Sequence, residues 1–436
     1  MKIISSYGIE IKQMNKIFRP TVAIYNDAIS FCIDAFENEW VNINVLDIMR
    51  RKQYAEILIH TTKNNKAKYD FDSKFYKMPS YMRRSVINTA LGYLSSYHSN
   101  LDNWYSNGCI GRKPTLQRKL NQFPTFYKDN MYTNDCEGDY CRLKLYINKD
   151  CVWVKIKLNH TDIQYINKHL LHTKISTPTL EKKHHKWFLR FSYEEDVKLN
   201  NTDLKDQKIL AIDMGISTDA TCSVMKSDGT ILARKFINFA SEKDHLNHTL
   251  NKIKKVQQRY GSYNTTKLWR YATNHNIELS RKIAKAIVDY AVSQNIDVIV
   301  FEHLDTKGKK RGYKSKKQRL HLWRKCYIQD LVEHKAHRKG IRISRVCAWN
   351  TSKFAYDGSG VVERDKSNYE ICTFSTGKKY NCDLSASYNI GARYFIRGIE
   401  KSISAKKWSD IVAKVPECQK RTLCTYNTLL EINKVA

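Results

Sequence analysis

Three acidic residues stand in parts of the sequence that are otherwise apolar. Asp213 interrupts the run KILAIDMGI, Glu302 ends the run IDVIVFEHL, and Asp383 precedes the helical pattern LSASYNI. Burying an isolated carboxylate is costly unless a partner offsets its charge. Taken one at a time, each residue has an ordinary explanation, since Glu302 can end a strand and Asp383 can cap a helix. Taken together, they predict a shared site, provided that the fold brings them to one place.

The elements around these residues follow a definite order. Three strands come first, with Asp213 in the first of them, and helical stretches fill about residues 240–294. The strand that ends at Glu302, a basic helical region, the strand IRISRVC and the helix that opens at Asp383 follow. This is the order of an RNase H-like nuclease core, in which the first strand, the fourth strand and the last helix meet at one edge of the sheet. We therefore expect the three carboxylates to converge there.

Converging carboxylates repel one another, and the repulsion raises their pKa values unless cations neutralise them. Mg2+ prefers hard oxygen ligands, so two Mg2+ ions held by Asp213, Glu302 and Asp383 would stabilise the cluster. One ion would activate a water molecule, and the other would stabilise the leaving oxygen of a phosphodiester. The predicted chemistry is Mg2+-dependent phosphodiester hydrolysis, with these residues as catalytic and metal-binding groups.

The first half of the chain carries two other patterns. Apolar residues recur at helical spacing within 21–36 and 78–104, which predicts a helical unit over residues 20–104. Later the period changes to two in the segments CRLKLYIN, VWVKIKL and WFLRFSY. In the second of these segments, one face carries Val152, Val154, Ile156 and Leu158. We expect half-buried antiparallel strands of a small barrel, to which the first strand of the chain could belong.

The charge balance indicates the class of partner. Lys and Arg number 75 against 43 Asp and Glu, a formal net charge of +32, which favours a polyphosphate partner. The sequence shows no signal peptide and no apolar run of about 18 residues, so we expect a soluble cytoplasmic, nucleoid-associated protein without a membrane partner. The 12 cysteines form no C-x-x-C pair, which indicates reduced thiols and neither a disulfide framework nor an ordinary zinc knuckle.

Three segments, AIDMGIS, VIVFEHL and CDLSASYNIGARYF, resemble the three RuvC motifs of TnpB, the RNA-guided nuclease family that bacterial insertion sequences encode. The segments MPSYMRRSVINTALGYLSSYHSNLDNW and PTFYKDNMY extend the similarity to the N-terminal half. The family is related to compact type V CRISPR effectors. The resemblance implies a guide RNA, and a short target-adjacent DNA motif that the protein reads.

The resemblance also implies an α+β multidomain fold. A wedge-type β-barrel would occupy residues 1–19 and 105–205, with a helical recognition domain, 20–104, inserted into it. A RuvC nuclease domain with an RNase H-like α/β core would follow at 206–436. This domain would contain an insertion at about 348–382, where the family usually has a zinc ribbon.

The zinc ribbon of this chain is degenerate. Where the family has its first cysteine pair, the sequence reads TSKFAYDGSG; in the second pair Cys372 remains, but Ser375 stands in the place of its partner. A tetrahedral zinc site needs four good ligands. We therefore expect no zinc, while the three carboxylates of the sheet are kept.

Basic residues indicate where nucleic acid binds. Residues 307–325, KGKKRGYKSKKQRLHLWRK, hold ten Lys or Arg and no acid, and in the family a lid over the active site lies here. The family also places one helix of the recognition unit near the target-adjacent motif, where Asn and Arg can read base edges. The predicted nucleic-acid contacts are Arg83, Arg84, Asn88, Lys309, Lys310, Arg311, Lys316, Lys317, Arg319 and Arg364.

The sequence thus predicts a TnpB-type, guide-RNA-bound, Mg2+-dependent endodeoxyribonuclease that cleaves double-stranded target DNA as a monomer or transient dimer. One alternative is an RNA-guided DNA-binding repressor, which would be expected to lose one or more of the carboxylates. A CRISPR-associated type V effector of the same fold is a second, distinguished by whether the guide is an omega RNA or a CRISPR-type RNA. A strand-transferring transposase is a third, and no tyrosine-recombinase pattern or helix-turn-helix supports it.

Overall fold

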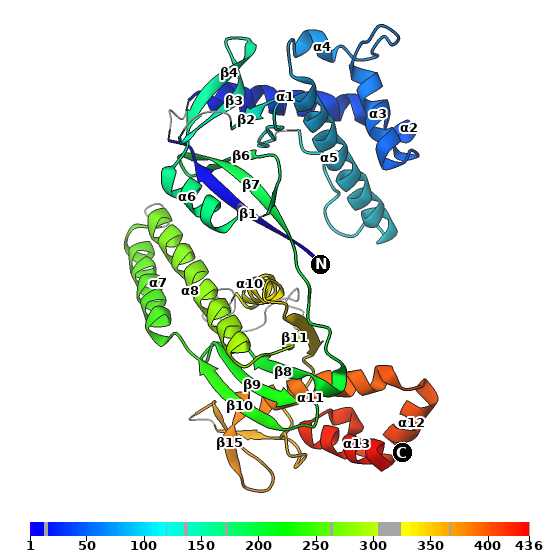
Figure 1. Cartoon of the computed structure of the whole chain (residues 1–436), viewed down its shortest axis with the longest axis vertical. Coiled ribbons are helices and arrows are strands. Elements are labelled where there is room, and N and C mark those ends of the chain that lie inside the picture. Colours follow the sequence, from blue (N-terminus) through cyan, green and yellow to red (C-terminus); the bar gives the residue numbers. More distant parts are fainter. Residues whose placement is uncertain are drawn as a thin grey trace. The chain divides into compact units, whose positions relative to one another are not determined.

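The computed structural model describes residues 1–12, 16–118, 120–134, 138–170, 173–261, 265–303, 324–365 and 368–435 (Figure 1). The chain divides into two compact units, Lys2–Glu195 and Asp196–Ala436, and Met1 groups with the second. Each unit has its own hydrophobic core. In the part of the chain that the structure describes, no helix is both long enough and apolar enough to cross a bilayer.

The helices of the first unit confirm the predicted helical stretches. Helix α1 (Phe18–Glu37) packs against α5 (Ser80–Ser106), and their buried faces follow the expected spacing. The buried residues include Tyr25, Ile29, Cys32 and Phe36 on α1 and Met82, Val86, Ala90 and Leu94 on α5. Three shorter helices lie between them in the sequence: α2 (Trp40–Asn44), α3 (Ile48–Ile59) and α4 (Phe71–Lys74).

The strands of the first unit form two sheets. One has the order β1-β7-β5, with β6 also paired to β7, and the other has the order β2-β3-β4. A bridge between Ile11 and Leu158 connects the end of β1 with the end of β4. The bounds are β1 Lys2–Glu10, β2 Tyr132–Thr133, β3 Tyr140–Ile147, β4 Asp150–Lys157, β5 Lys174–Ile175, β6 Thr179–Lys183 and β7 Lys186–Asp196, with helix α6 at His160–His169.

The predicted alternation holds along β7, where Trp187, Leu189 and Phe191 are buried. Along β4 it is partly wrong, because Val152 is 41% exposed although Ile156 is buried. Strand β4 lies at the edge of its sheet. The first residues of this edge strand lack a layer above them, so the pattern of apolar residues overstated their burial.

The second unit is built on a five-stranded sheet with the order β10-β9-β8-β11-β12. Its strands are β8 Lys208–Asp213, β9 Ala220–Lys226, β10 Ile231–Ile237, β11 Val298–His303 and β12 Arg342–Cys347. Strands β8, β9 and β10 pair antiparallel, whereas β11 pairs parallel with both β8 and β12. The expected three-strand meander followed by two parallel strands is therefore present.

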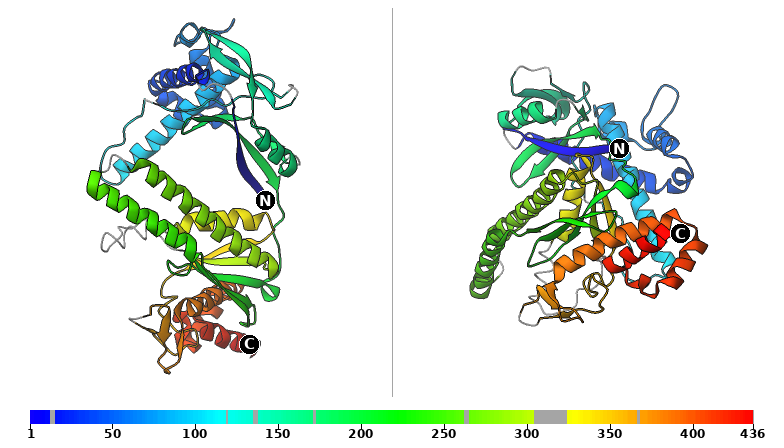
Figure 2. Two further views of the ribbon diagram at one scale, coloured as in Figure 1. Left: turned by 90° about the vertical axis from the view of Figure 1, so that its left-hand side faces the viewer. Right: turned by 60° about the horizontal axis from the view of Figure 1, so that its bottom comes forward.

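Helices cover both faces of this sheet. Helices α8 (Thr266–Ser293) and α10 (Lys325–His337) pack on one face, and α11 (Cys382–Ser402) and α13 (Leu423–Val435) pack on the other. Helix α7 (Ala240–Tyr260) runs beside α8, as two views show (Figures 1 and 2). The described residues also form α12 (Ala405–Lys414) and two short 3-10 helices, η1 Leu204–Asp206 and η2 Pro416–Lys420. Strands buried on both faces explain the continuous apolar runs around Asp213 and Glu302.

A small three-stranded sheet lies between β12 and α11 in the sequence. Its strands are β13 Glu363–Arg364, β14 Ile371–Thr373 and β15 Lys379–Asn381. Cys372 and Cys382 are both buried in its core with Ala355 and Phe374. Burial raises the pKa of the Cys382 thiol to about 12 and also raises that of Cys372. In this segment the two cysteines therefore pack as apolar groups with aromatic neighbours.

Candidate active site

Asp213 and Glu302 lie on neighbouring strands and on the same face of the sheet. The parallel register pairs Val300 of β11 with Ala211 of β8, and two residues further along each strand stand Glu302 and Asp213. Because side chains alternate between the faces, both carboxylates share the face of Val300 and Ala211, which α11 covers. Adjacent strands are about 4.8 Å apart, so the two acids are lateral neighbours.

Asp383 comes to the same place from α11, but it does not cap the helix. The N-cap is Asn381, whose side-chain oxygen accepts a hydrogen bond of 2.8 Å from the backbone N–H of Leu384. Asp383 lies in the first turn, and the capping explanation is therefore wrong by two residues. A Cβ placed on Gly215 would be 3.8 Å from Asp383 Oδ2 and only 2.7 Å from the carbonyl oxygen of Thr218. The Asp383 carboxylate thus lies against the turn that follows Asp213, at a position where only glycine fits.

The three charges act on one another. Burial raises the pKa of Asp213 well above its ordinary value, and the negative charges of Glu302 and Asp383 raise it further. The pKa of Asp383 is also raised, first by burial and then by Glu370 and Glu302. Arg364 acts in the opposite direction and lowers the pKa of both aspartates. The sheet edge therefore holds more negative charge than the protein itself neutralises.

Glu302 is the most firmly held of the three acids. The Thr351 hydroxyl donates a hydrogen bond to Oε1 of Glu302, and the ammonium of Lys325 lies 3.5 Å from Oε2. Gln329 donates a hydrogen bond of 3.2 Å to the backbone oxygen of Glu302. Lys325 and Thr351 are 3% and 2% exposed, so their contacts with Glu302 are shielded from water. A buried lysine therefore supplies a positive charge beside this buried carboxylate.

Helix α11 is fixed above the acids by a buried amide. Asn389 donates hydrogen bonds of 3.0 Å to the carbonyl oxygen of Thr351 and 2.9 Å to that of Phe354. Its own oxygen accepts a hydrogen bond of 3.1 Å from the backbone N–H of Leu423, at the start of α13. One side chain therefore connects α11, the loop that contacts Glu302, and α13.

The donor set suits a hard cation. The three residues offer carboxylate oxygens, the ligands that Mg2+ prefers, and their mutual repulsion would be relieved by a divalent ion. Among the described residues, no group of three or more His, Cys, Asp or Glu side chains is already arranged around a common point for a metal ion. Thr351 and Lys325 each contact a different oxygen of Glu302, and each oxygen keeps a further lone pair with which it could bind an ion.

Comparisons with known proteins agree with the motifs. Residues 5–147 match the Aq_aa04 family. TnpB-like protein aq_aa05 of Aquifex aeolicus (strain VF5) is 24% identical over 208 residues, which cover 42% of this chain and 67% of the relative. The chain is a homologue of a TnpB-like protein. The resemblance predicted from the RuvC-like motifs is confirmed.

Solved structures show the same fold. A Cas12f1 protein in complex with sgRNA and target DNA superposes with a TM-score of 0.55 at 14% identity, covering 86% of this chain and 81% of its own. The mini-RNA-guided endonuclease CRISPR-Cas phi3 gives a TM-score of 0.53 at 10% identity, covering 90% of this chain and 92% of its own. At such identities the likeness concerns the fold alone, and it confirms the expected α+β class.

The predicted nucleic-acid contacts differ in their surroundings. Arg84 and Asn88 are exposed on α5, one turn apart, as a DNA-facing surface requires. Arg83 is 8% exposed and lies 3.3 Å from Glu56 and 3.8 Å from Asp72, whereas Arg84, which lies 3.7 Å from the same Glu56, has a side chain that is 56% exposed. We correct this part of the prediction, because Arg83 connects α5 to acidic partners and cannot reach a base.

The other predicted contacts lie in the second unit. Arg364 is exposed on β13, close enough to the aspartates to lower their pKa values. The remaining six lie outside the described residues: Lys309, Lys310, Arg311, Lys316, Lys317 and Arg319.

Sequence reasoning missed Lys325 and Thr351 as partners of Glu302. Lys325 is the last residue of the basic run 307–325, and nothing distinguishes it there from its nine basic neighbours. Thr351 lies in the segment TSKFAYDGSG, which the sequence marked only by its lack of the expected cysteines. The signal available for Asn389 was its place inside the motif CDLSASYNIGARYF, directly between Tyr388 and Ile390 in a stretch of small and apolar residues.

Proposed function

We propose that this protein is an RNA-guided DNA endonuclease of TnpB type, which cleaves target DNA beside a short flanking motif. The observation that carries the proposal is the juxtaposition of Asp213, Glu302 and Asp383 at one end of the sheet. Each of the three carboxylates makes ionisation of the others less favourable, which a purely structural role explains poorly. A divalent-ion site accounts for all three. The homology to a TnpB-like protein supports the same reaction class.

The residues at the sheet edge would have different roles in the reaction. Asp213, Glu302 and Asp383 would hold two Mg2+ ions, which when bound supply an activated water molecule and stabilise the leaving oxygen of the phosphodiester. Lys325 lies 3.5 Å from the Glu302 carboxylate and would help to orient it. Arg364, exposed nearby, would contact a phosphate of the bound strand.

Guidance by RNA is supported by charge and by likeness. The excess of 75 basic over 43 acidic residues suits a protein that covers a large nucleic acid. The Cas12f1 relative in fold is bound to sgRNA and target DNA. We assign the roles of a wedge domain to residues 1–19 and 105–205, of a recognition domain to 20–104, and of a RuvC domain to 206–436.

The test is the substitution Asp383→Asn, assayed with the copurified RNA and a matching target DNA in Mg2+. Asparagine keeps the size of the side chain, and Asn381 continues to cap the helix, so the fold should persist. Cleavage should fall by about 100-fold or more, because even indirect contacts in metal sites are worth about 10–100-fold. Guided DNA binding should be unchanged, since base pairing carries it.

A matched control is Asp410→Asn, which removes one exposed carboxylate from α12 and should leave cleavage unchanged. If Asp383→Asn cleaves at close to the wild-type rate, the metal-ligand assignment is wrong. If the wild type binds guided target DNA but never cleaves it in Mg2+ or Mn2+, the repressor alternative replaces the nuclease.

A further inference from the structure

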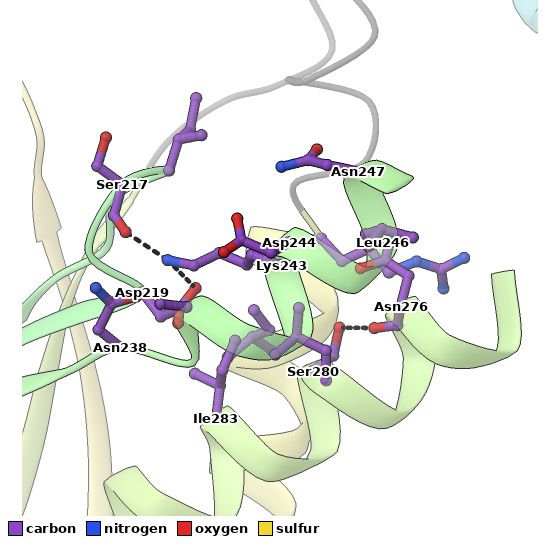
Figure 3. A pocket seen from close by; sticks show the side chains of 15 residues that line it. Ser217, Asp219, Asn238, Lys243, Asp244, Leu246, Asn247, Asn276, Ser280 and Ile283 are labelled. Atoms are coloured by element: carbon purple, nitrogen blue, oxygen red, sulfur yellow. Dashed lines mark hydrogen bonds and ion pairs between the residues drawn. The ribbon is translucent and has the colours of Figure 1, made fainter. Parts of the chain in front are cut away.

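A pocket of about 300 Å3 opens in the second unit, on the side of the sheet that α8 and α10 cover (Figure 3). It lies between the loop that joins β8 to β9, the start of α7, the middle of α8 and the start of α10. Its apolar lining includes Leu246, Leu279, Ile283 and Ile328 from the helices and Ile216 from the β8–β9 loop. Its volume is at the lower limit of the about 300–1,000 Å3 typical of small-molecule sites. The pocket is therefore of the size that holds a small organic group.

Two chain connections join the lining of this pocket to the residues of the proposed active site. Ser217 lines it and follows Asp213 by four residues, a separation of at most about 14 Å for an extended chain. On the other side Arg324 lines it, and Lys325, the next residue, contacts Glu302. The rise per nucleotide is about 3.4 Å in a duplex and larger in an extended single strand, so 14 Å corresponds to at most about four nucleotides of a DNA strand.

The wall nearest Asp213 is held rigid. Lys243 of α7 donates a hydrogen bond to the backbone oxygen of Ser217, and its ammonium lies 3.4 Å from Asp219 Oδ1. Asp219 also accepts a hydrogen bond of 2.7 Å from the backbone N–H of Phe239. These contacts join the β8–β9 loop to the start of α7, as Figure 3 shows. The pocket is thus preformed by the protein's own contacts.

The charges around the pocket cancel, which decides what it can hold. The lining includes two cations, Lys243 and Arg324, and two carboxylates, Asp219 and Asp244. Lys243 is already paired with Asp219, and the second carboxylate, Asp244, would repel a phosphate group bound inside the pocket. Because a charged ligand gains little there, the interior suits a neutral, polar ring.

Two amides supply the polar edge. Asn238, in the segment before α7, and Asn247, on α7, line the pocket from different elements (Figure 3). Within the described ranges neither side chain makes a hydrogen bond to the protein, so each has a donor and an acceptor available for a ligand. Apolar walls that cover a flat ring and amides that read its edge are the features by which proteins hold an unstacked nucleobase.

We propose that this pocket binds one unpaired nucleobase of the DNA strand that is cleaved, within about four nucleotides of the cleaved bond. The inference rests on the proposed function, because it assumes that this strand passes the carboxylates. Binding the base here would fix the strand on one side of the reacting phosphate. Arg324 would lie at the mouth of the pocket, where the phosphate of the same nucleotide remains.

The test uses 2-aminopurine, a base whose fluorescence rises when it leaves the stack. The RNA-bound protein is mixed in EDTA with target DNA that carries 2-aminopurine at one position at a time along each strand. We expect a several-fold rise at one position, within about four nucleotides of the bond that the protein cleaves in Mg2+. Asn247→Trp, which places an indole over the mouth of the pocket, should abolish the rise while DNA binding persists.

The matched control is Gln257→Trp, exposed on the same helix and outside the pocket lining, which should keep the rise. Asp383→Asn should also keep it, because base binding requires no cleavage. Fluorescence that never rises, or that rises equally in Asn247→Trp, overturns the pocket assignment even if cleavage is normal. Conversely, a rise that depends on residue 247 without any cleavage in Mg2+ would retain the pocket and reject the nuclease.

Discussion

Asp213 should destabilise the metal-free protein, and its neutralisation should therefore raise the melting temperature. At a strand spacing of about 4.8 Å and an effective dielectric constant of about 20, the repulsion between two unit charges is about 3.5 kcal/mol. The ammonium of Lys325 offsets part of the repulsion from Glu302. We expect Asp213→Asn to stabilise the second unit by about 1–3 kcal/mol in EDTA at neutral pH. For a unit of this size the melting temperature should rise by about 2–4 °C for each kcal/mol.

The pH dependence of this effect has a definite sign. Folding raises the pKa of Asp213 above the value of about 3.9 that an unfolded aspartate has. The folded protein therefore binds this proton more tightly, and the wild type loses stability as the pH rises from about 4 through the folded pKa. Asp213→Asn lacks this proton, so the difference between the two melting temperatures should widen over the same range and then remain constant.

The assay is thermal unfolding of both proteins in EDTA and again with Mg2+. Added Mg2+ should stabilise the wild type more than Asp213→Asn, since binding of an ion to the folded state raises stability. Asp228→Asn serves as a control with the opposite expectation, because a backbone N–H of Thr230 holds the pKa of Asp228 below its usual range. A variant Asp213→Asn that melts at or below the wild type in EDTA at neutral pH would refute the electrostatic argument.

Three further outcomes are expected. Asn381→Ala should lower the free energy of unfolding by about 1 kcal/mol by removing the cap of α11, while the folded fraction should still cleave. Asp383→Asn should reduce cleavage and leave stability nearly unchanged. If both variants changed stability and cleavage equally, the cap and the metal ligand would not be separate roles. Elemental analysis should find well under one zinc ion per chain, and Cys372→Ser should change cleavage little; stoichiometric zinc whose removal unfolds the C-terminal region would show that other ligands replace the missing cysteines. The purified protein should carry a structured RNA whose retention falls steeply with salt concentration, and a soluble, RNA-free protein that cleaves fully at low salt would exclude a guide.

The elements that carry the site could be predicted because their signals are local. Asp213 and Glu302 each stand at the end of a continuous apolar run, the pattern of a strand buried on both faces. The order of strands and helices then brings these runs side by side. Locating each run needed only the sequence within about ten residues of the acid, whereas their convergence followed from the order of the elements over the whole second half of the chain.

The contacts that complete the site could not be predicted because they join distant residues. Lys325 is 23 residues from Glu302, and Thr351 is 49 residues from it; neither lies in a pattern that marks it as buried. The N-cap of α11 could not be predicted for a different reason. Asn381 and Asp383 are both good capping residues, and the sequence does not show at which one the helix begins. Arg83 and Arg84 are adjacent and alike, and only packing decides that the first is turned inward.

The separation of Asn381 from Asp383 bears on how such a protein can evolve. A single base change turns an aspartate codon into an asparagine codon, and here that change would spare the residue that starts the helix. At Asp213 the same substitution would remove a negative charge that destabilises the sheet when no metal is bound. A change towards a protein that binds DNA without cleaving it would therefore increase the stability of the fold. A lineage that keeps all three acids must therefore be under continuing selection for what they do, because folding alone would not preserve them.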